Sequence, residues 1–329
     1  MLHKLLYLGL MLVANSCFAG DIVDIGIAGT GGIEFKKNKH LSIEKQILDI
    51  SQNAIRVEYV IENHSNESVR ENVFFPLPFV GFDSGCASNN RKDTSNFKIT
   101  ADGSEVMLLR TARARLNDGT DVYEKLGNLG FLDDEIAFFQ GAHVDCGNKS
   151  VRLSGKFANS QEVLRAEGLM NASSLPLWES SIVYYWEQLF SPHQQIRVVQ
   201  EYVPYLIQGI GVLDFDSPGV WEQYMEKNFC MTKGTLKKAK EIIKRTTTYY
   251  GKGVKYAGID FALPTDSRWN GVTKDFSLIL RKRSEYQIVS LCFDGNFRKE
   301  NDVTLISNIK NFSPKQGIRL VYFTPAFFD

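Results

Sequence analysis

The sequence predicts a mainly β protein, an antiparallel β-sandwich-like fold with helical insertions and one amphipathic helix before a C-terminal β-meander. Three observations carry this prediction. Short stretches alternate apolar with polar residues, Gly, Asp, Asn and Pro separate them, and no regular alternation of strands with helices is present. The 329 residues, 43% hydrophobic and 23% charged, have the composition of a globular protein.

The most regular strand pattern lies between residues 53 and 78. Every second residue from Ile55 to Ile61 is apolar, which is the period of a strand with one buried face, and only Val60 breaks the pattern. The polar residues 63–67 indicate a turn, and residues 69–75 alternate again. We therefore expect an antiparallel hairpin that ends at Pro76, because proline donates no backbone hydrogen bond.

Further strands are expected on both sides of this hairpin. Residues 97–106 predict a second hairpin that turns at Asp102-Gly103, and residues 107–116 are expected to extend its sheet. The C-terminal meander is expected to contain strands at 254–262, 275–281, 287–293, 302–309 and 318–323.

Helical patterns interrupt the strands. Residues 118–176 are expected to form a mixed insertion, with helices capped at Thr120 and Ser160. Residues 232–245 predict the clearest helix, because apolar residues such as Leu236 lie on one face and lysines on the other. A solvated face is the favoured interpretation of these lysines, and an anion-binding face is the alternative.

Residues 1–19 have the pattern of a secretory signal peptide. The apolar run from Leu5 to Ala14 is too short to cross a bilayer, and small residues precede a cleavage site after Ala19. We expect a periplasmic protein with no transmembrane segment in the mature chain. The alternative is a lipoprotein anchored through Cys17, although its preceding residues fit that pattern poorly.

Two parts are expected to follow the signal peptide. Residues 20–229 would form the sandwich-like domain, which carries the insertion at 118–176. Residues 230–329 would form the amphipathic helix and the meander, either as a separate domain or packed as one unit with the first.

The mature chain retains Cys86, Cys146, Cys230 and Cys292. An even number in an exported chain predicts two disulfides, for which three pairings exist. We favour Cys86–Cys146 and Cys230–Cys292, because Cys230 precedes the amphipathic helix and Cys292 lies in a strand against which that helix can pack. The cysteines are not spaced as metal ligands. We expect no metal and no cofactor.

No sequence motif favours an enzyme. The chain contains no GxSxG, HExxH or Walker loop, and its histidines are scattered singly. The formal net charge of zero gives no general attraction to nucleic acid. We therefore favour a non-enzymatic envelope protein that binds another envelope protein or a glycan.

A candidate ligand site lies in and just after the insertion. Trp178 and Glu179 follow a proline-containing stretch, and Asp133, Asp134 and Glu135 lie in the insertion itself. An indole face beside carboxylates suits a sugar or a cationic group. The competing interpretation, which we favour, is that Trp178 covers the edge of a core.

Two further function classes stay open. Tryptophans with neighbouring acidic residues, such as Trp186-Glu187, are compatible with a carbohydrate-binding or carbohydrate-cleaving protein, although Trp186 and Trp269 are better explained as core residues. A structural subunit of an envelope assembly would instead need an exposed strand edge.

Several motifs in fixed order resemble one family. They are Gly31-Gly32-Ile33, VEYVIEN followed by FFPLP, the Asp102-Gly103 turn, ARARLNDGTDVYEKL, YYWEQLFSPHQQIRVVQEYVP, WNGVTKDFSLIL and VSLC. Together they resemble the bacterial secreted family called domain of unknown function 4424, over nearly the whole mature chain. The resemblance implies an exported β-rich protein and brings no activity, cofactor or catalytic residue with it.

The chain departs from this family at one motif. The resemblance implies a histidine before the tyrosine of a Tyr-x-Pro motif, and this chain has Gln200-Glu201-Tyr202 there. The resemblance therefore implies no role that rests on that histidine.

Overall fold

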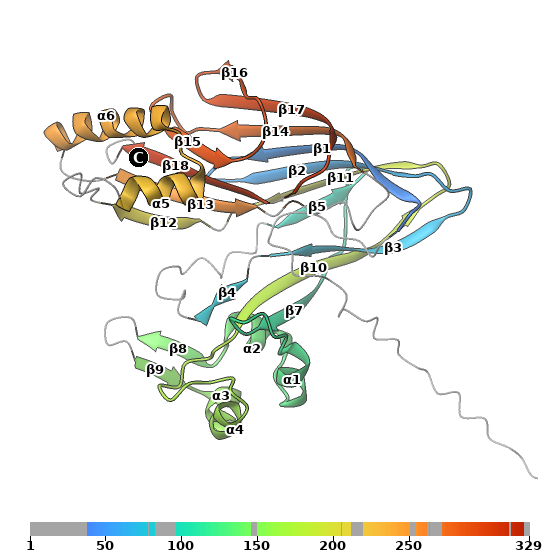
Figure 1. The fold of residues 1–329 in the computed structure, drawn as a ribbon. Helices are drawn as coiled ribbons and strands as arrows, with labels where there is room; N and C mark the ends of the chain where they lie inside the picture. Colours follow the sequence, from blue (N-terminus) through green and yellow to red (C-terminus); the bar gives the residue numbers. More distant parts are fainter. Residues whose placement is uncertain are drawn as a thin grey trace, which may run out of the picture.

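The computed structural model describes residues 38–77, 79–82, 97–145, 150–204, 206–211, 220–250, 254–261, 263, 272–315 and 317–325. This part of the chain is mainly β, with several antiparallel sheets and few helices, which confirms the predicted fold class. The sheets lie in layers, with helices at one end and below (Figure 1).

The largest sheet has eight strands. Their order is β16 (Arg298–Asn301), β17 (Thr304–Phe312), β14 (Thr273–Arg281), β1 (Leu41–Ile50), β2 (Ile55–Asn63), β11 (Gln195–Tyr202), β5 (Lys98–Ala101) and β6 (Ser104–Glu105). β1 and β14 pair in parallel, with Lys45 opposite Asp275. This ladder crosses the boundary expected at 229/230, so the N-terminal and C-terminal parts of the chain share one sheet.

A second sheet of four strands is built around the long strand β10 (Glu179–Phe190). β10 pairs with β3 (Val69–Pro76), β4 (Val80–Gly81) and β7 (Leu109–Arg115). In Figure 1, β10 runs from the larger sheet down to the insertion. β7 was expected to extend the sheet of β5 and β6, and that prediction is wrong because β7 pairs with β10.

The two strands of the expected central hairpin exist, but they do not pair with each other. β2 pairs with β1 on one edge and β11 on the other, whereas β3 pairs with β10 in the second sheet. Both hydrogen-bonding edges of β2 are therefore taken by other strands. Hydrophobic periodicity shows which face of a strand is buried, and it cannot show which strand lies beside it.

The second expected hairpin is confirmed. β5 and β6 pair across a turn in which Asp102 and Gly103 both have positive φ, 48° and 81°. Two such residues make the turn whose twist matches a two-residue hairpin, and glycine and aspartate tolerate that backbone best.

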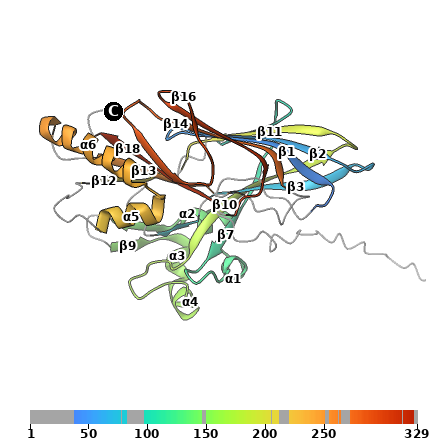
Figure 2. The same cartoon turned by 45° about the horizontal axis from the view of Figure 1, so that its top comes forward.

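A third sheet contains β12 (Ile207–Gly211), β13 (Val254–Phe261), β18 (Ile318–Pro325) and β15 (Ile288–Cys292). It packs on the eight-stranded sheet, because Ile259 and Leu320 share one hydrophobic cluster with Leu48, Val57 and other residues of the larger sheet. All the C-terminal strands expected from the sequence are present, but they divide between these two sheets. Figure 2 shows the two layers from a second direction.

The insertion carries its own core. It contains α1 (Tyr123–Asn128), α2 (Asp133–Phe138), β8 (Ala142–Asp145), β9 (Ser150–Leu153), α3 (Gly155–Asn159) and α4 (Gln161–Ala166). A second hydrophobic cluster joins these helices to β7 and β10. The predicted cap at Thr120 is wrong, because the N-cap of α1 is Val122. Ser160 is the N-cap of α4, as predicted, but its side chain makes no capping hydrogen bond.

The expected amphipathic helix is α6 (Lys233–Tyr250), and α5 (Val220–Phe229), which was not expected, precedes it. Leu236 of α6 packs with Phe229, Met231, Val321 and Phe323 against the third sheet. Cys230, between the helices, lies at disulfide distance from Cys292 of β15, with an S–S separation of 2.15 Å. Across the residues that the structure describes, no helix has the length and apolar character needed to cross a membrane.

Candidate functional site

Trp178 lies in the core of the insertion. Its side chain is 1% exposed, its ring is stacked on Phe157, and its Nε1 donates a hydrogen bond to the carbonyl oxygen of Ile136 at 3.4 Å. A ring enclosed in this way presents no face to a sugar. The core interpretation of Trp178 therefore explains the structure, and the ligand-binding one does not.

The acidic residues expected beside Trp178 each have a separate partner. Glu179 pairs with Arg115 at 3.1 Å and Asp134 pairs with Arg110 at 2.9 Å. Asp133 accepts a hydrogen bond from the Tyr123 hydroxyl at 2.8 Å, and Glu135 accepts one from the backbone N–H of Leu132 at 2.9 Å. The last contact caps the first turn of α2, so these carboxylates stabilise local structure and form no common site with the indole.

The other expected site residues are distributed as follows. Cys230 and Cys292 lie together as described above, whereas Cys17, Cys86, Cys146 and Trp269 are outside the described residues. Trp186 is 3% exposed and belongs to the main core, as expected.

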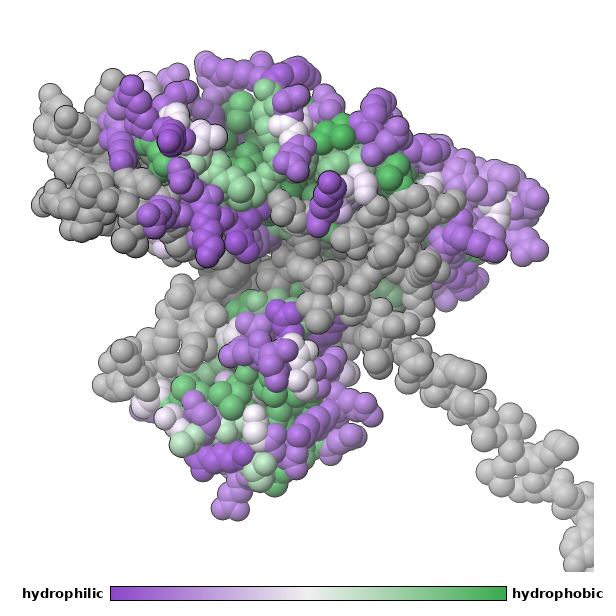
Figure 3. Space-filling model, viewed as in Figure 1, coloured by the Kyte–Doolittle hydropathy of each residue, from purple (hydrophilic) through white to green (hydrophobic). Residues whose placement is uncertain are grey.

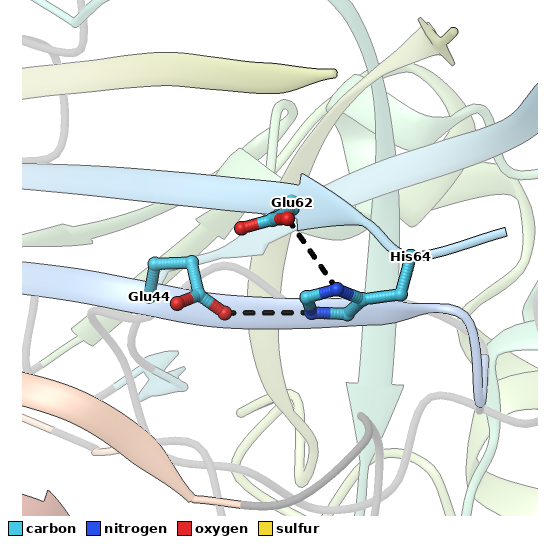
Figure 4. A group of neighbouring side chains, drawn as sticks. All are labelled: Glu44, Glu62 and His64. Atoms are coloured by element: carbon cyan, nitrogen blue, oxygen red, sulfur yellow. Dashed lines mark ion pairs between the residues drawn. The ribbon is translucent and has the colours of Figure 1, made fainter. Parts of the chain in front are cut away.

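A different polar cluster lies on the outer face of the eight-stranded sheet. It consists of Ser42 and Glu44 of β1, Glu62 of β2 and His64 just after β2, and we call it the β1–β2 cluster. Figure 4 shows the imidazole of His64 between the two carboxylates. On the face drawn in Figure 3, hydrophilic side chains lie along the top of the molecule over β16, and hydrophobic residues gather below them.

A bulge in β1 brings Glu44 into the cluster. Ile43 is paired with Ile61 and Lys45 with Val60, so Glu44 is the extra residue between them. The bulge shifts the alternation along β1: Leu41 and Ile43 face the core before it, and Gln46 and Leu48 face the core after it. A bulge of this kind re-aims a side chain, and here it leaves Glu44 on the same face as Ser42.

The cluster is tightly connected. His64 Nε2 lies 3.4 Å from Glu44 Oε1, and His64 Nδ1 lies 3.4 Å from Glu62 Oε1. The Ser42 hydroxyl donates to Glu44 Oε1 at 2.6 Å and lies 2.6 Å from His64 Nε2. The backbone N–H of His64 donates to the carbonyl oxygen of His40 at 2.8 Å, which holds the backbone of His64 beside the start of β1.

Lys274 of β14 completes the electrostatics. Its Nζ lies 2.7 Å from Glu44 Oε2. Partial burial acts to raise the pKa of Glu44, but the hydrogen bonds from Lys274 and Ser42 and the charges of Lys274 and His64 outweigh it, so this pKa is lowered. The Glu44 hydrogen bond raises the pKa of Lys274. The pair is therefore ionised at neutral pH.

Two chemistries fit these distances. Ser42, His64 and Glu62 have the connectivity of a nucleophile, a base and an orienting acid. However, Ser42 is 3% exposed and its hydroxyl is already bonded to Glu44, so a substrate cannot reach it. Coordination of a cation is the better fit, because the carboxylate and imidazole side chains of Glu44, Glu62 and His64 are 16%, 22% and 35% exposed and remain accessible.

Only part of this cluster could be found in the sequence. Glu62 and His64 flank Asn63, which is fully buried, so residues two apart at the end of a strand share its outer face. The contribution of Glu44 depends on a bulge, and that of Lys274 depends on the parallel pairing of β1 with β14. Neither feature has a local sequence signal.

The fold and the cluster together define a mainly β protein with a candidate cation site on the outer face of its largest sheet. A family model described as a domain of unknown function (DUF4424) matches residues 25–321, and the chain belongs to this family.

A comparison with curated proteins found no match. Among solved structures, a Legionella pneumophila protein provisionally called a nutrient binding protein has a TM-score of 0.42 and 11% sequence identity, covering 90% of this chain and 71% of that one. A likeness at this level carries no information about function.

Proposed function

We propose that the protein is an exported binding protein of the cell envelope that holds a divalent transition-metal ion, of the zinc class, at the β1–β2 cluster. His64 Nε2 and a carboxylate oxygen of Glu44 are the direct ligands. Glu62 holds the other imidazole nitrogen. The observation that carries the proposal is the placement of His64 between these two carboxylates.

The distances support this assignment. Two ligands of a tetrahedral zinc ion lie about 3.4 Å apart when each bond is about 2.1 Å long. His64 Nε2 and Glu44 Oε1 are separated by 3.4 Å. Metal-bound histidines usually donate their second N–H to a carboxylate, which orients the ring, and Glu62 lies opposite Nδ1 in that role.

The N-terminal sequence and the cysteines support export. Residues 1–19 have the pattern of a cleaved signal peptide, and a cysteine pair at disulfide distance is typical of proteins in oxidising compartments. N-terminal sequencing of the protein recovered from the envelope should begin at Gly20. An intact Met1 or a lipid-modified Cys17 would refute this part of the proposal.

The two other function classes have less support. Carbohydrate binding through Trp178 or Trp186 is disfavoured because both rings are buried. Assembly through β16, an edge of the largest sheet, is disfavoured because Arg298, Lys299 and Glu300 are exposed along it, and charged edge strands resist pairing with another chain.

Titration of zinc into the metal-free protein tests the proposed site. Wild type should bind one ion in a saturable isotherm. His64→Gln and Glu44→Gln should each lose at least about 10-fold in affinity, and Glu62→Gln about 10-fold through loss of ring orientation.

His193 provides the matched control. It is an exposed histidine on another turn, where its Nε2 lies 2.8 Å from Asn66 Oδ1. His193→Gln should leave the isotherm unchanged. Absence of saturable binding by wild type, or equal losses from the substitutions at His64 and His193, would exclude the β1–β2 cluster as the site.

A further inference from the structure

The carboxylate of Glu44 forms an ion pair with a lysine of the same sheet, Lys274. Its Oε2 contacts Lys274 Nζ at 2.7 Å, while its Oε1 faces Ser42 and His64. The two oxygens of the Glu44 carboxylate therefore have different neighbours. Oε2 faces the ammonium group of Lys274, whereas Oε1 faces the Ser42 hydroxyl and an imidazole nitrogen of His64.

The sheet fixes Lys274 in this place. β14 lies beside β1 in parallel register, with Asp275 opposite Lys45, so Lys274 and Glu44 are neighbours across the ladder. The lysine side chain is 54% exposed, which leaves its flexible stem free to swing toward solvent. Lys274 can therefore leave Glu44 without disturbing the core.

We propose that Lys274 is the specificity-determining residue of the β1–β2 cluster, an internal cation that excludes ions able to bind carboxylate alone. This inference rests on the proposed function of the cluster. Calcium and magnesium bind through oxygen ligands and would have to compete with the ammonium for Glu44. A zinc-class ion also forms a bond to His64 Nε2, for which Lys274 does not compete. This bond offsets the repulsion between the ion and the Lys274 ammonium, so the ion binds at the cluster.

The test compares zinc and calcium titrations of wild type, Lys274→Met and Lys274→Arg at low ionic strength. Removal of a unit charge a few ångströms from the bound ion should tighten zinc binding at least about 5-fold. Calcium binding should tighten more than zinc binding, so the ratio of the two affinities falls. Lys274→Arg keeps the charge and should keep the wild-type ratio.

Lys310→Met controls for the general effect of charge. Lys310 pairs with Asp275, the residue after Lys274 on the same strand, and its loss removes one positive charge outside the cluster. Its zinc and calcium affinities should stay within about 2-fold of wild type, since screened surface charges at this remove act weakly.

The outcomes separate the inference from the proposed function. Zinc binding by wild type with no gain in Lys274→Met, or an equal gain in Lys310→Met, overturns the role of Lys274 and leaves the cluster intact as a site. Zinc binding by neither wild type nor Lys274→Met overturns both. Zinc binding by Lys274→Met alone also overturns both, because the wild-type cluster then holds no zinc ion for Lys274 to select.

Discussion

At the scale of the residue, Gln200 stands out in the sheet interior. It is completely buried on β11, between Val57 of β2 and Ile99 of β5. Its Nε2 and Oε1 have no hydrogen-bond partner among the residues that the structure describes. A buried amide left in this state costs free energy, because it gave up hydrogen bonds to water on folding.

We expect Gln200→Met to raise the free energy of unfolding by about 1 kcal/mol. Methionine has nearly the same shape as glutamine and removes the desolvated amide, and an apolar replacement of an unpaired buried polar group is neutral or stabilising. Urea denaturation of both proteins under the same conditions measures the difference.

Gln287 is the matched control for this substitution. It is 1% exposed, donates to Gln52 Oε1 at 2.9 Å and Thr324 Oγ1 at 2.6 Å, and accepts from the backbone N–H of Arg283. Gln287→Met should destabilise the protein by about 1 to 3 kcal/mol, because it leaves these buried partners without their hydrogen bonds. If Gln200→Met destabilised the protein as much, the Gln200 amide would have to be bonded in solution.

At the scale of the element, charge pairs on the outer face join neighbouring strands of the largest sheet. Arg197 of β11 forms a two-pronged contact with Glu58 of β2, at 2.8 and 2.6 Å, and Arg56 lies 3.2 Å from the same carboxylate. The hydrogen bond from Arg197 lowers the pKa of Glu58, against the opposing effect of partial burial. The pairing of β2 with β11 therefore depends in part on an ionised carboxylate.

The sign of the pH effect follows from this lowered pKa. Glu58 has a lower pKa in the folded protein than in the unfolded chain, where the pKa is 4.5. The contribution of its charge to the stability of the fold is therefore complete above pH 4.5. That contribution is lost as the pH falls through the pKa of the folded state. Wild type should be more stable than Glu58→Gln at pH 7, and the difference should vanish under strongly acidic conditions.

Urea denaturation of both proteins across the acid range checks this expectation. Glu105→Gln, at an exposed carboxylate on β6, is the control and should track wild type throughout. A stability difference between wild type and Glu58→Gln that did not change with pH would show that charge at Glu58 is unimportant.

Sequence reasoning succeeded for single elements and failed for their neighbours. The alternation in β2 and the Asp102-Gly103 turn were both predicted, because each depends only on residues that are neighbours in the sequence. Side-chain period determines the first, and backbone φ preference determines the second. The partners of β2 and β3 depend on contacts between distant segments. Glu44 and Lys274 could not be predicted as members of the cluster for the same reason. Trp178 was singled out from the sequence as a candidate site residue, and its burial shows that it is a core residue.

At the scale of the whole molecule, one covalent link ties the helical end to the sheets. Cys230 lies between α5 and α6, and Cys292 lies on β15, at the edge of the third sheet. Around it, Ser290 Oγ donates to the carbonyl oxygen of Phe229 at 3.0 Å. The small cluster of Phe229, Met231, Leu236, Val321 and Phe323 is the apolar contact that this link holds in place.

We expect replacement of both Cys230 and Cys292 by alanine to lower the free energy of unfolding by about 4 kcal/mol. The two residues are 62 positions apart, and closing a loop of that length removes roughly this much conformational freedom from the unfolded chain. A cluster this small is poorly able to hold both helices without the link, so α5 and α6 should exchange amide hydrogens faster than β13 and β18 in the double variant. Urea denaturation and hydrogen exchange measure the two effects, with chemically reduced wild type as a control that should match the double variant if its other thiols contribute little. A loss below about 1 kcal/mol, or non-reducing peptide maps that join Cys230 to Cys86 or Cys146, would show that this pair does not anchor the helices.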